Sequence, residues 1–243
     1  MSGPARHTTH FDTIAGEYDR TLPAHVRDHY LKRRLALIAA SVGQGRVLDV
    51  GCGTGLLAGA LGQRGLQMVG VDDSREMMRA STVEPKPLFV QGLAYQLPFR
   101  TGTLDGTVSV AMLHHLITRE AVAGTIREMA RITRSGGVVI LWDHNPLNPY
   151  WPVLMRKLPQ DAGGYRLVSL QEILRTVRQL PSVSSVRVIR TGIIPDFLPA
   201  QLLPLAQRIE QWLERTPLLR KVLAHNVVML SVQHPTGAAH VAR

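Results

Sequence analysis

One glycine-rich segment constrains the fold of this chain more than any other feature of its sequence. Residues 46–50 form a short apolar run with β-branched side chains, which predicts a buried parallel strand. Gly51, Gly53 and Gly55 follow at alternate positions, and residues 56–64 have the pattern of a helix. Glycine lets the backbone approach a ligand closely, and a helix N-terminus presents N–H groups without intrahelical partners. This order of strand, turn and helix predicts a ligand site at the turn.

Two acidic residues accompany the turn. Asp49 lies at the end of the first strand, where it can accept hydrogen bonds from the loop or from a ligand ammonium group. The second strand, residues 67–71, is followed by Asp72, which lies 23 positions beyond Asp49. An acidic residue at this distance is positioned to bind ribose hydroxyls. The alternative is a tight strand-to-helix turn that binds no ligand.

The glycine spacing favours one class of ligand. Dinucleotide sites usually have G-x-G-x-x-G, whereas this chain has G-x-G-x-G after an acid. Together with Asp72, this pattern resembles the class I S-adenosylmethionine-dependent methyltransferases, and most closely their small-molecule branch, which includes ubiquinone/menaquinone-type enzymes. The resemblance implies S-adenosylmethionine as cofactor. It also implies an α/β, Rossmann-like fold with a seven-stranded, mostly parallel sheet of order 3-2-1-4-5-7-6 and helices on both faces.

Two further phrases extend the resemblance and supply candidate catalytic residues. Residues 10–20 resemble a helix that closes over the cofactor in many relatives, whose tyrosine, here Tyr18, often lines the active site; the alternative is a helix that only packs on the core. The phrase A-x-L-H-H-L begins at Ala111 and brings His114 and His115 to the carboxyl end of the fourth strand. Neutral imidazole can accept a proton near pH 7, so either histidine is a candidate base. Alternatively, one of them caps the following helix or bonds to the backbone.

Two positions depart from the pattern of the family. Relatives usually have an apolar residue where Asp73 stands, and Leu93 replaces the acid that receives the adenine amino group. The adenine contact is therefore expected from backbone, water or Asp73. Met77 and Met78 belong either to the core or to the cofactor pocket. The cofactor-binding residues expected are Asp49, Gly51, Cys52, Gly53, Gly55, Asp72, Asp73, Met77, Gly92, Leu93, Ala94 and Ala111.

The chain is expected to form a single domain with three parts. These are an N-terminal helical cap (residues 10–42), a cofactor-binding core (residues 45–145) and a helical insertion between the last two strands (residues 191–225). The insertion has one apolar stripe, which predicts a cover for the core or a lid over a hydrophobic pocket, with membrane contact as a further alternative. A long loop at residues 146–165 is a candidate substrate wall, with Trp151 in it. Asp143 and His144, after the fifth strand, are further candidates for substrate contact.

Composition narrows the partners and the compartment. The net charge of +10 would suit nucleic acid, an anionic membrane or an acidic substrate, but the 28 lysines and arginines are dispersed, with one tight cluster at residues 32–34. This charge, including the cluster, is expected to lie on solvated surface. Cys52 is the only cysteine, so an internal disulfide is excluded and a cytoplasmic location is expected. No metal is expected, because magnesium prefers oxygen ligands and two histidines stand where metal-assisted relatives have carboxylates.

The sequence therefore predicts methyl transfer from S-adenosylmethionine to an oxygen, nitrogen or carbon of a small, lipophilic or aromatic metabolite. Two alternatives stay open. One is a nucleic-acid methyltransferase, whose substrate affinity would fall steeply with salt. The other is an S-adenosylmethionine-binding protein with a different catalytic activity or none.

Overall fold

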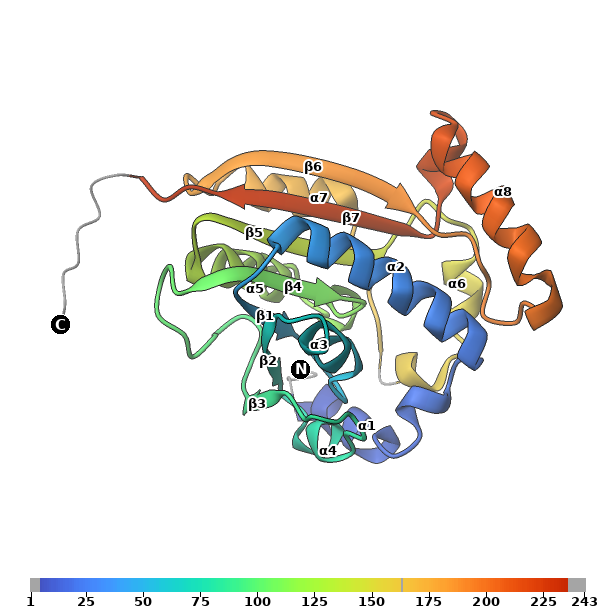
Figure 1. Cartoon of the computed structure of the whole chain (residues 1–243), viewed down its shortest axis with the longest axis horizontal. Coiled ribbons are helices and arrows are strands. Elements are labelled where there is room, and N and C mark those ends of the chain that lie inside the picture. Colours follow the sequence, from blue (N-terminus) through green and yellow to red (C-terminus); the bar gives the residue numbers. More distant parts are fainter. Residues whose placement is uncertain (1–4, 163, 236–243) are drawn as a thin grey trace.

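The computed structural model describes residues 5–162 and 164–235, which contain one seven-stranded sheet of order β3-β2-β1-β4-β5-β7-β6 (Figure 1). This is the predicted order. Strands β1 to β5 pair in parallel, and β7 runs antiparallel to both β5 and β6. The strands are β1 (Arg46–Val50), β2 (Gln67–Asp72), β3 (Leu88–Gln91), β4 (Leu104–Val110), β5 (Thr133–His144), β6 (Val183–Thr191) and β7 (His225–Val232).

Helices cover both faces of the sheet, as expected (Figure 1). On one face α2 (Ala24–Val42) and α3 (Leu56–Gly62) contribute to one core cluster, and on the other α5 (Arg119–Ile132) and α7 (Leu170–Val177) contribute to a second. Adjacent residues of β1 alternate between the two clusters, because successive side chains of a strand point to opposite faces. Val47 packs in the first cluster and Leu48 in the second, and both are fully buried.

Two element boundaries differ from the sequence prediction. The single helix expected over residues 10–20 is α1 (Ala5–Ile14) followed by a turn and a 3-10 helix, η1 (Tyr18–Arg20). Gly16 lies in this turn, and glycine costs a helix about 1 kcal/mol relative to alanine. The sequence also predicts a helix over residues 118–134 that Ser135, Gly136 and Gly137 bring to an end, but α5 ends at Ile132 and the chain passes directly into β5 at Thr133. This β-branched residue pairs with Leu104 of β4, so the sheet extends past the glycines.

The remaining helices lie in the connections between strands, and most of them are short. They are α4 (Arg75–Arg79), α6 (Trp151–Leu154) and the 3-10 helices η2 (Leu113–His115), η3 (Pro159–Asp161), η4 (Ala200–Leu202) and η5 (Leu219–Val222), with the longer α8 (Leu203–Arg215). The predicted helical insertion is thus formed by η4, α8 and η5, between β6 and β7. Among the described residues, every helix is too short or too polar to cross a bilayer.

Buried charge fixes α8 to α2. The Glu210 carboxylate is fully buried, and it accepts hydrogen bonds from the Arg33 guanidinium at 2.6 Å and from the His29 imidazole at 3.0 Å. Arg33 also bonds to the Glu214 carboxylate at 2.6 Å. Residues 32–34, expected to lie on a solvated face, therefore include an arginine that anchors the insertion.

Candidate active site

A cavity of about 670 Å³ lies at the carboxyl ends of β1, β2 and β4. Because β1 lies between β2 and β4, the loops that follow these three strands meet at one edge of the sheet. Eleven of the twelve predicted cofactor-binding residues line the cavity, and Gly55 is the exception. The eleven are Asp49, Gly51, Cys52, Gly53, Asp72, Asp73, Met77, Gly92, Leu93, Ala94 and Ala111.

The glycine turn has a backbone that other residues adopt only with strain. Gly51 has φ +73°, and a Cβ there would overlap Met112 Cγ. Gly55 has φ +80°, and a Cβ there would lie 2.6 Å from Phe89 Cζ. The turn is held to the next strand, since the N–H groups of Gly51 and Cys52 both donate to the Val71 carbonyl. The alternating glycines are therefore required by backbone conformation and by close packing.

Asp72 organises the turn as well as lining the cavity. One carboxylate oxygen accepts a hydrogen bond from Gly53 N–H at 2.7 Å, and the other accepts from Ser74 N–H at 2.9 Å. Burial raises the pKa of this carboxyl to about 6, although the two hydrogen bonds lower it. Carboxylate oxygens have further acceptor sites, so Asp72 can hold the turn and still bind a ligand hydroxyl.

Asp49 is a buried acid at the floor of the cavity. Its side chain is almost fully buried, and burial, with the charge of Asp72 as a second cause, raises its pKa to about 7. The guanidinium of Arg34 opposes this shift. Arg34 is half-buried, lines the cavity, and its guanidinium carbon lies 5.9 Å from the centroids of the Tyr30 and Trp142 rings. Sequence reasoning missed Arg34 because it stands in the basic cluster at residues 32–34, which looked like solvated surface.

The N-terminal segment closes one side of the cavity. Tyr18 lines it, and burial raises the pKa of its phenol to about 12, so the hydroxyl stays protonated as a hydrogen-bond donor. Two side-chain bonds fasten the segment to the cofactor loops. Thr54 Oγ1 donates to the Asp19 carboxylate at 3.0 Å, and Ser74 Oγ donates to the Asp12 carboxylate at 2.5 Å. Tyr18 therefore belongs to the cavity wall rather than to the core alone.

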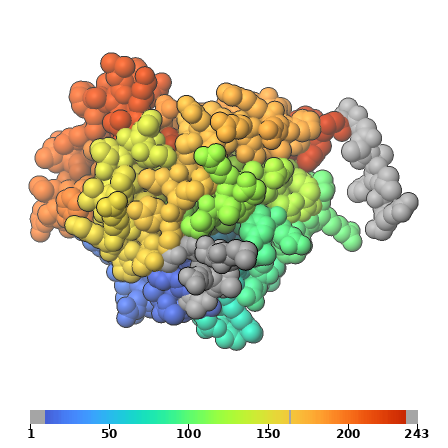
Figure 2. Space-filling view, turned by 180° about the vertical axis from the view of Figure 1, so that it is seen from behind, coloured from blue at the N-terminus to red at the C-terminus, as the bar shows by residue number. Residues whose placement is uncertain are grey.

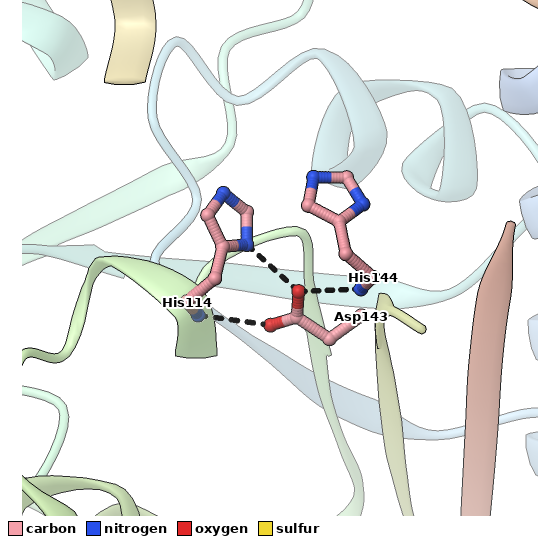
Figure 3. A group of neighbouring side chains, drawn as sticks. All are labelled: His114, Asp143 and His144. Atoms are coloured by element: carbon pink, nitrogen blue, oxygen red, sulfur yellow. Dashed lines mark hydrogen bonds and ion pairs between the residues drawn. The ribbon is translucent and has the colours of Figure 1, made fainter. Parts of the chain in front are cut away.

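The two adjacent histidines occupy different positions. His115 lines the cavity, with its ring 4.9 Å from that of Phe11. His114 is buried behind the wall, where its Nδ1 lies 2.7 Å from a carboxylate oxygen of Asp143 (Figure 3). Asp143 also accepts hydrogen bonds from the backbone N–H groups of His114 and His144. Asp143 therefore fixes the orientation of His114, and His115 is the histidine that a substrate can reach.

The other candidates near the fifth strand pack in the interior. His144 stacks on the indole of Trp151 with centroids 3.7 Å apart, and burial lowers its pKa well below the usual value. Trp151 donates its indole N–H to the Ala224 carbonyl. Within the described ranges, residues 146–162, 164–165 and 191–225 contribute nothing to the lining of the cavity. The insertion therefore adds no side chain to the cavity wall, whereas the loop of residues 146–165 lies directly behind this wall, because a carboxylate oxygen of Asp161 is 3.6 Å from His114 Nε2.

Some buried side chains are close enough to hold a metal ion. One group is His114, His115 and Asp161, and another is His114, Asp143 and His144. In the first group His114 Nε2 lies 3.6 Å from a carboxylate oxygen of Asp161, a residue that sequence spacing could not connect to the histidines. Burial raises the pKa of Asp161 to about 6.

Comparison with known proteins identifies the family. A family model described as a methyltransferase domain matches residues 48–141. Demethylmenaquinone methyltransferase of Mycobacterium tuberculosis is 33% identical over 161 residues, which are 63% of this chain and 67% of that protein. A tRNA (carboxymethyluridine(34)-5-O)-methyltransferase of Xenopus tropicalis is 31% identical over 133 residues, 54% of this chain. This chain spans only 20% of the length of that tRNA enzyme.

The solved structures agree on the fold. An S-adenosylmethionine-dependent methyltransferase of Thermotoga maritima superposes with a TM-score of 0.64 at 16% identity, covering 93% of this chain and 99% of that one. The chain belongs to the class I S-adenosylmethionine-dependent methyltransferases, with S-adenosylmethionine as its cofactor.

The residues present fit this cofactor. Gly51 and Gly53 line the cavity with backbone alone, and a Cβ at Gly51 would collide with Met112, so glycine is needed to keep the turn in this position. Two carboxyl groups, the buried Asp49 and the half-buried Asp72, face the same cavity as this turn. Asp49 would hold the cationic end of the cofactor and Asp72 its ribose hydroxyls. Asp73 and Leu93, the two departures from the family pattern, also line the cavity, so they would lie beside the bound cofactor.

Cofactor affinity is expected to rise with pH between about 5.5 and 8. The pKa values of Asp49 (about 7) and Asp72 (about 6) are raised by burial, so part of each is protonated near neutrality. A cationic ligand stabilises the ionised carboxylate, so binding releases a proton, and affinity changes by up to about tenfold per pH unit below the pKa. Titration calorimetry at several pH values, in two buffers of different ionisation enthalpy, measures both effects. Asp49→Asn should flatten the profile, whereas pH-independent affinity in the unmodified protein would contradict the assignment.

Proposed function

We propose that this enzyme methylates an oxygen, nitrogen or carbon of a small lipophilic or aromatic metabolite. The observation that carries the proposal is an apolar part of the cavity wall, which is formed by the segment after β4 together with α1. Phe11, Met112, Leu116 and Ile117 line the cavity beside Ala111. A flat apolar acceptor would bury its surface here, at about 25 cal/mol per Å². The identity to demethylmenaquinone methyltransferases supports the same substrate class.

The chemistry requires little from the protein beyond positioning and proton removal. The bound cofactor supplies a methyl group on a positively charged sulfur, which leaves as a neutral thioether. The cavity walls would hold the acceptor with its nucleophilic atom in contact with this methyl group. An acceptor hydroxyl, amine or acidic C–H loses its proton as the new bond forms. His115 is the histidine at the cavity, and we assign it as the base that receives this proton.

The experiment that tests the function is methyl transfer from labelled cofactor to a panel of acceptors. The panel includes a demethylated naphthoquinol, a catechol, an aromatic amine and total tRNA. Transfer to a neutral aromatic acceptor with little salt dependence supports the proposal. Transfer to tRNA with a steep fall in rate as salt rises would replace it with the nucleic-acid alternative, which the Xenopus tropicalis relative represents. Cofactor binding without transfer to any acceptor would favour a binding protein.

His115→Ala is expected to lower turnover about 100-fold or more at saturating cofactor, since general base catalysis contributes roughly 10²–10⁴-fold. His114→Ala is expected to lower turnover less, because His114 acts through its packing behind the wall. His234→Ala is the matched control, since His234 bonds to the Thr133 carbonyl at the opposite end of β5. Rates at saturating acceptor, with cofactor affinity measured separately, decide the outcome. If His115→Ala turns over like the control, the assignment of His115 as the base is wrong, whatever the effect of His114→Ala.

A further inference from the structure

The helical insertion exposes an unusually apolar surface. Leu202, Leu205, Ile209 and Trp212 are spaced by three or four residues on α8 and the residue before it, so they form one stripe. Trp212 is 61% exposed and Leu205 57% exposed. The stripe continues at both ends of α8 into Phe197, Leu218, Leu219 and Val222. We call these eight residues the outer stripe.

Most of the large exposed apolar side chains of the described residues are concentrated in the outer stripe. Elsewhere in the described residues there are six large exposed apolar side chains, four of them single and two as a pair on β6, whereas residues 197–222 contain eight. Single exposed apolar residues are ordinary on a protein surface, but a contiguous patch marks a contact site. Since the outer stripe contributes nothing to the cavity lining and its side chains point outward, it does not serve as a lid.

The charges around the outer stripe have one sign. Arg208, Arg215, Arg220 and Lys221 are exposed in the same segment. The two acidic residues of the segment, Glu210 and Glu214, are turned inward to Arg33, with exposed side-chain fractions of 0% and 22%. Pairing of both acids with α2 leaves an outer surface of apolar and cationic side chains.

We propose that the outer stripe docks this enzyme on an anionic lipid bilayer. An interfacial helix presents apolar side chains to the acyl boundary and basic side chains to lipid headgroups, and this surface has both. Trp212, the exposed indole, belongs to the residue type that prefers the membrane–water interface. A second copy of this chain is a poorer occupant, because a two-fold contact would bring four basic side chains of each copy opposite one another.

The helical insertion leaves the sheet at the same strand ends at which the cavity opens. It leaves β6 at Thr191 and enters β7 at His225, and these two residues pair at the edge where β5 ends at His144. This is the edge at which the cavity opens. In Figure 1, α8 projects beyond this end of the sheet, and in Figure 2 the orange-red segment protrudes from the upper left of the molecule. Resting on the proposed function, docking would bring the cavity to the medium in which a lipophilic acceptor dissolves.

Trp212 provides a built-in reporter of docking. The chain has three tryptophans, and the other two, Trp142 and Trp151, are 2% and 6% exposed. A shift in fluorescence on mixing with vesicles therefore reports on the outer stripe. Tag-free enzyme, without cofactor or acceptor, would be mixed with vesicles of phosphatidylcholine alone or with one third phosphatidylglycerol. Sedimentation gives the bound fraction, and emission gives the environment of the indole.

The expected result is sedimentation with the anionic vesicles only, accompanied by a blue shift of the emission. Leu205→Ser with Ile209→Ser should lower the bound fraction at least tenfold, and these exposed positions allow folding. Arg215→Glu, which reverses a charge beside the outer stripe, should lower the bound fraction as well. Leu88→Ser is the control for the serine changes, since Leu88 on β3 is 65% exposed, and Arg64→Glu, at an exposed arginine outside the insertion, is the control for Arg215→Glu. Both controls should bind like the unmodified protein.

Three outcomes would overturn docking. The first is that the enzyme does not bind anionic vesicles. The second is that it binds without a blue shift and that the serine variant binds equally well. The third is that the enzyme is a dimer in solution and that the serine substitutions convert it to monomers. The second outcome would mean general charge attraction by the basic chain. Because vesicle binding is measured without acceptor, its failure leaves methyl transfer standing, and loss of methyl transfer leaves docking standing.

Discussion

Gly51→Ala should weaken the affinity for S-adenosylmethionine by roughly 30-fold or more. Alanine at φ +73° costs about 1 kcal/mol, and its Cβ would overlap Met112 Cγ near the root of that side chain, which cannot swing away cheaply. Forcing an extra methyl into packed space costs roughly 1–3 kcal/mol. The turn can relieve this strain only by moving away from Met112, which loosens its hydrogen bonds to the Val71 carbonyl and spoils the cradle. Each 1.4 kcal/mol is a factor of about ten in affinity.

Titration calorimetry measures this change, and circular dichroism checks that the variant is folded. Gly62→Ala is the control, because no atom lies within 4 Å of a Cβ there and Gly62 ends α3 in an ordinary helical conformation. That variant should bind the cofactor normally and gain about 0.5–1 kcal/mol of stability. A Gly51→Ala protein with affinity within twofold of the original would show that the turn does not contact the cofactor.

Asp72→Ala should weaken cofactor binding about tenfold to 100-fold. Removing a half-buried carboxylate leaves partners unsatisfied at a cost of roughly 1–3 kcal/mol. Two of these partners are visible already, since Gly53 N–H and Ser74 N–H both donate to Asp72. Loss of the ribose contact would add to the loss of turn geometry. We therefore expect a lower melting temperature as well as a weaker affinity, and competition with adenosine should separate the two effects.

Asp105→Ala is the matched control for this second change. Asp105 also accepts a backbone hydrogen bond, from Arg46 N–H at 2.7 Å, but it lies near the start of β4, at the ends of the strands opposite to the cavity. It should lower stability without altering cofactor affinity. Equal affinity of Asp72→Ala and the unmodified protein would remove Asp72 from the binding site and leave it with a structural role.

The parts of the fold that sequence predicted depend on local signals. The strand–turn–helix at Gly51 can be predicted from neighbouring residues, because the positive φ angles and the short Cβ contacts of the turn require glycine at fixed spacing. The strand order came from the family resemblance and is confirmed. Tyr18 and His115 were chosen from phrases that the family shares, and both line the cavity.

The parts that sequence missed depend on contacts between distant residues. Arg33 and Arg34 stand in one cluster, but one is paired with Glu210 of α8 and the other is half-buried beside aromatic rings. Spacing could not separate His114 from His115, because only their tertiary surroundings differ. Asp143 bonds to His114 from another strand, 29 positions away, and this partner decides which imidazole faces the cavity.

The cavity is assembled from two pieces of chain with different stability. Its floor belongs to the central strands, whose opening would require unfolding the domain. Its side wall is the short segment from Phe11 to Asp19, which two hydroxyl–carboxylate bonds, from Thr54 and Ser74, join to the cofactor loops. Segments with few such bonds open locally at far lower free energy than the core. Exchange of cofactor and product can therefore proceed by local opening of the N-terminal segment, while the sheet that orients the acids of the site stays folded throughout each catalytic cycle.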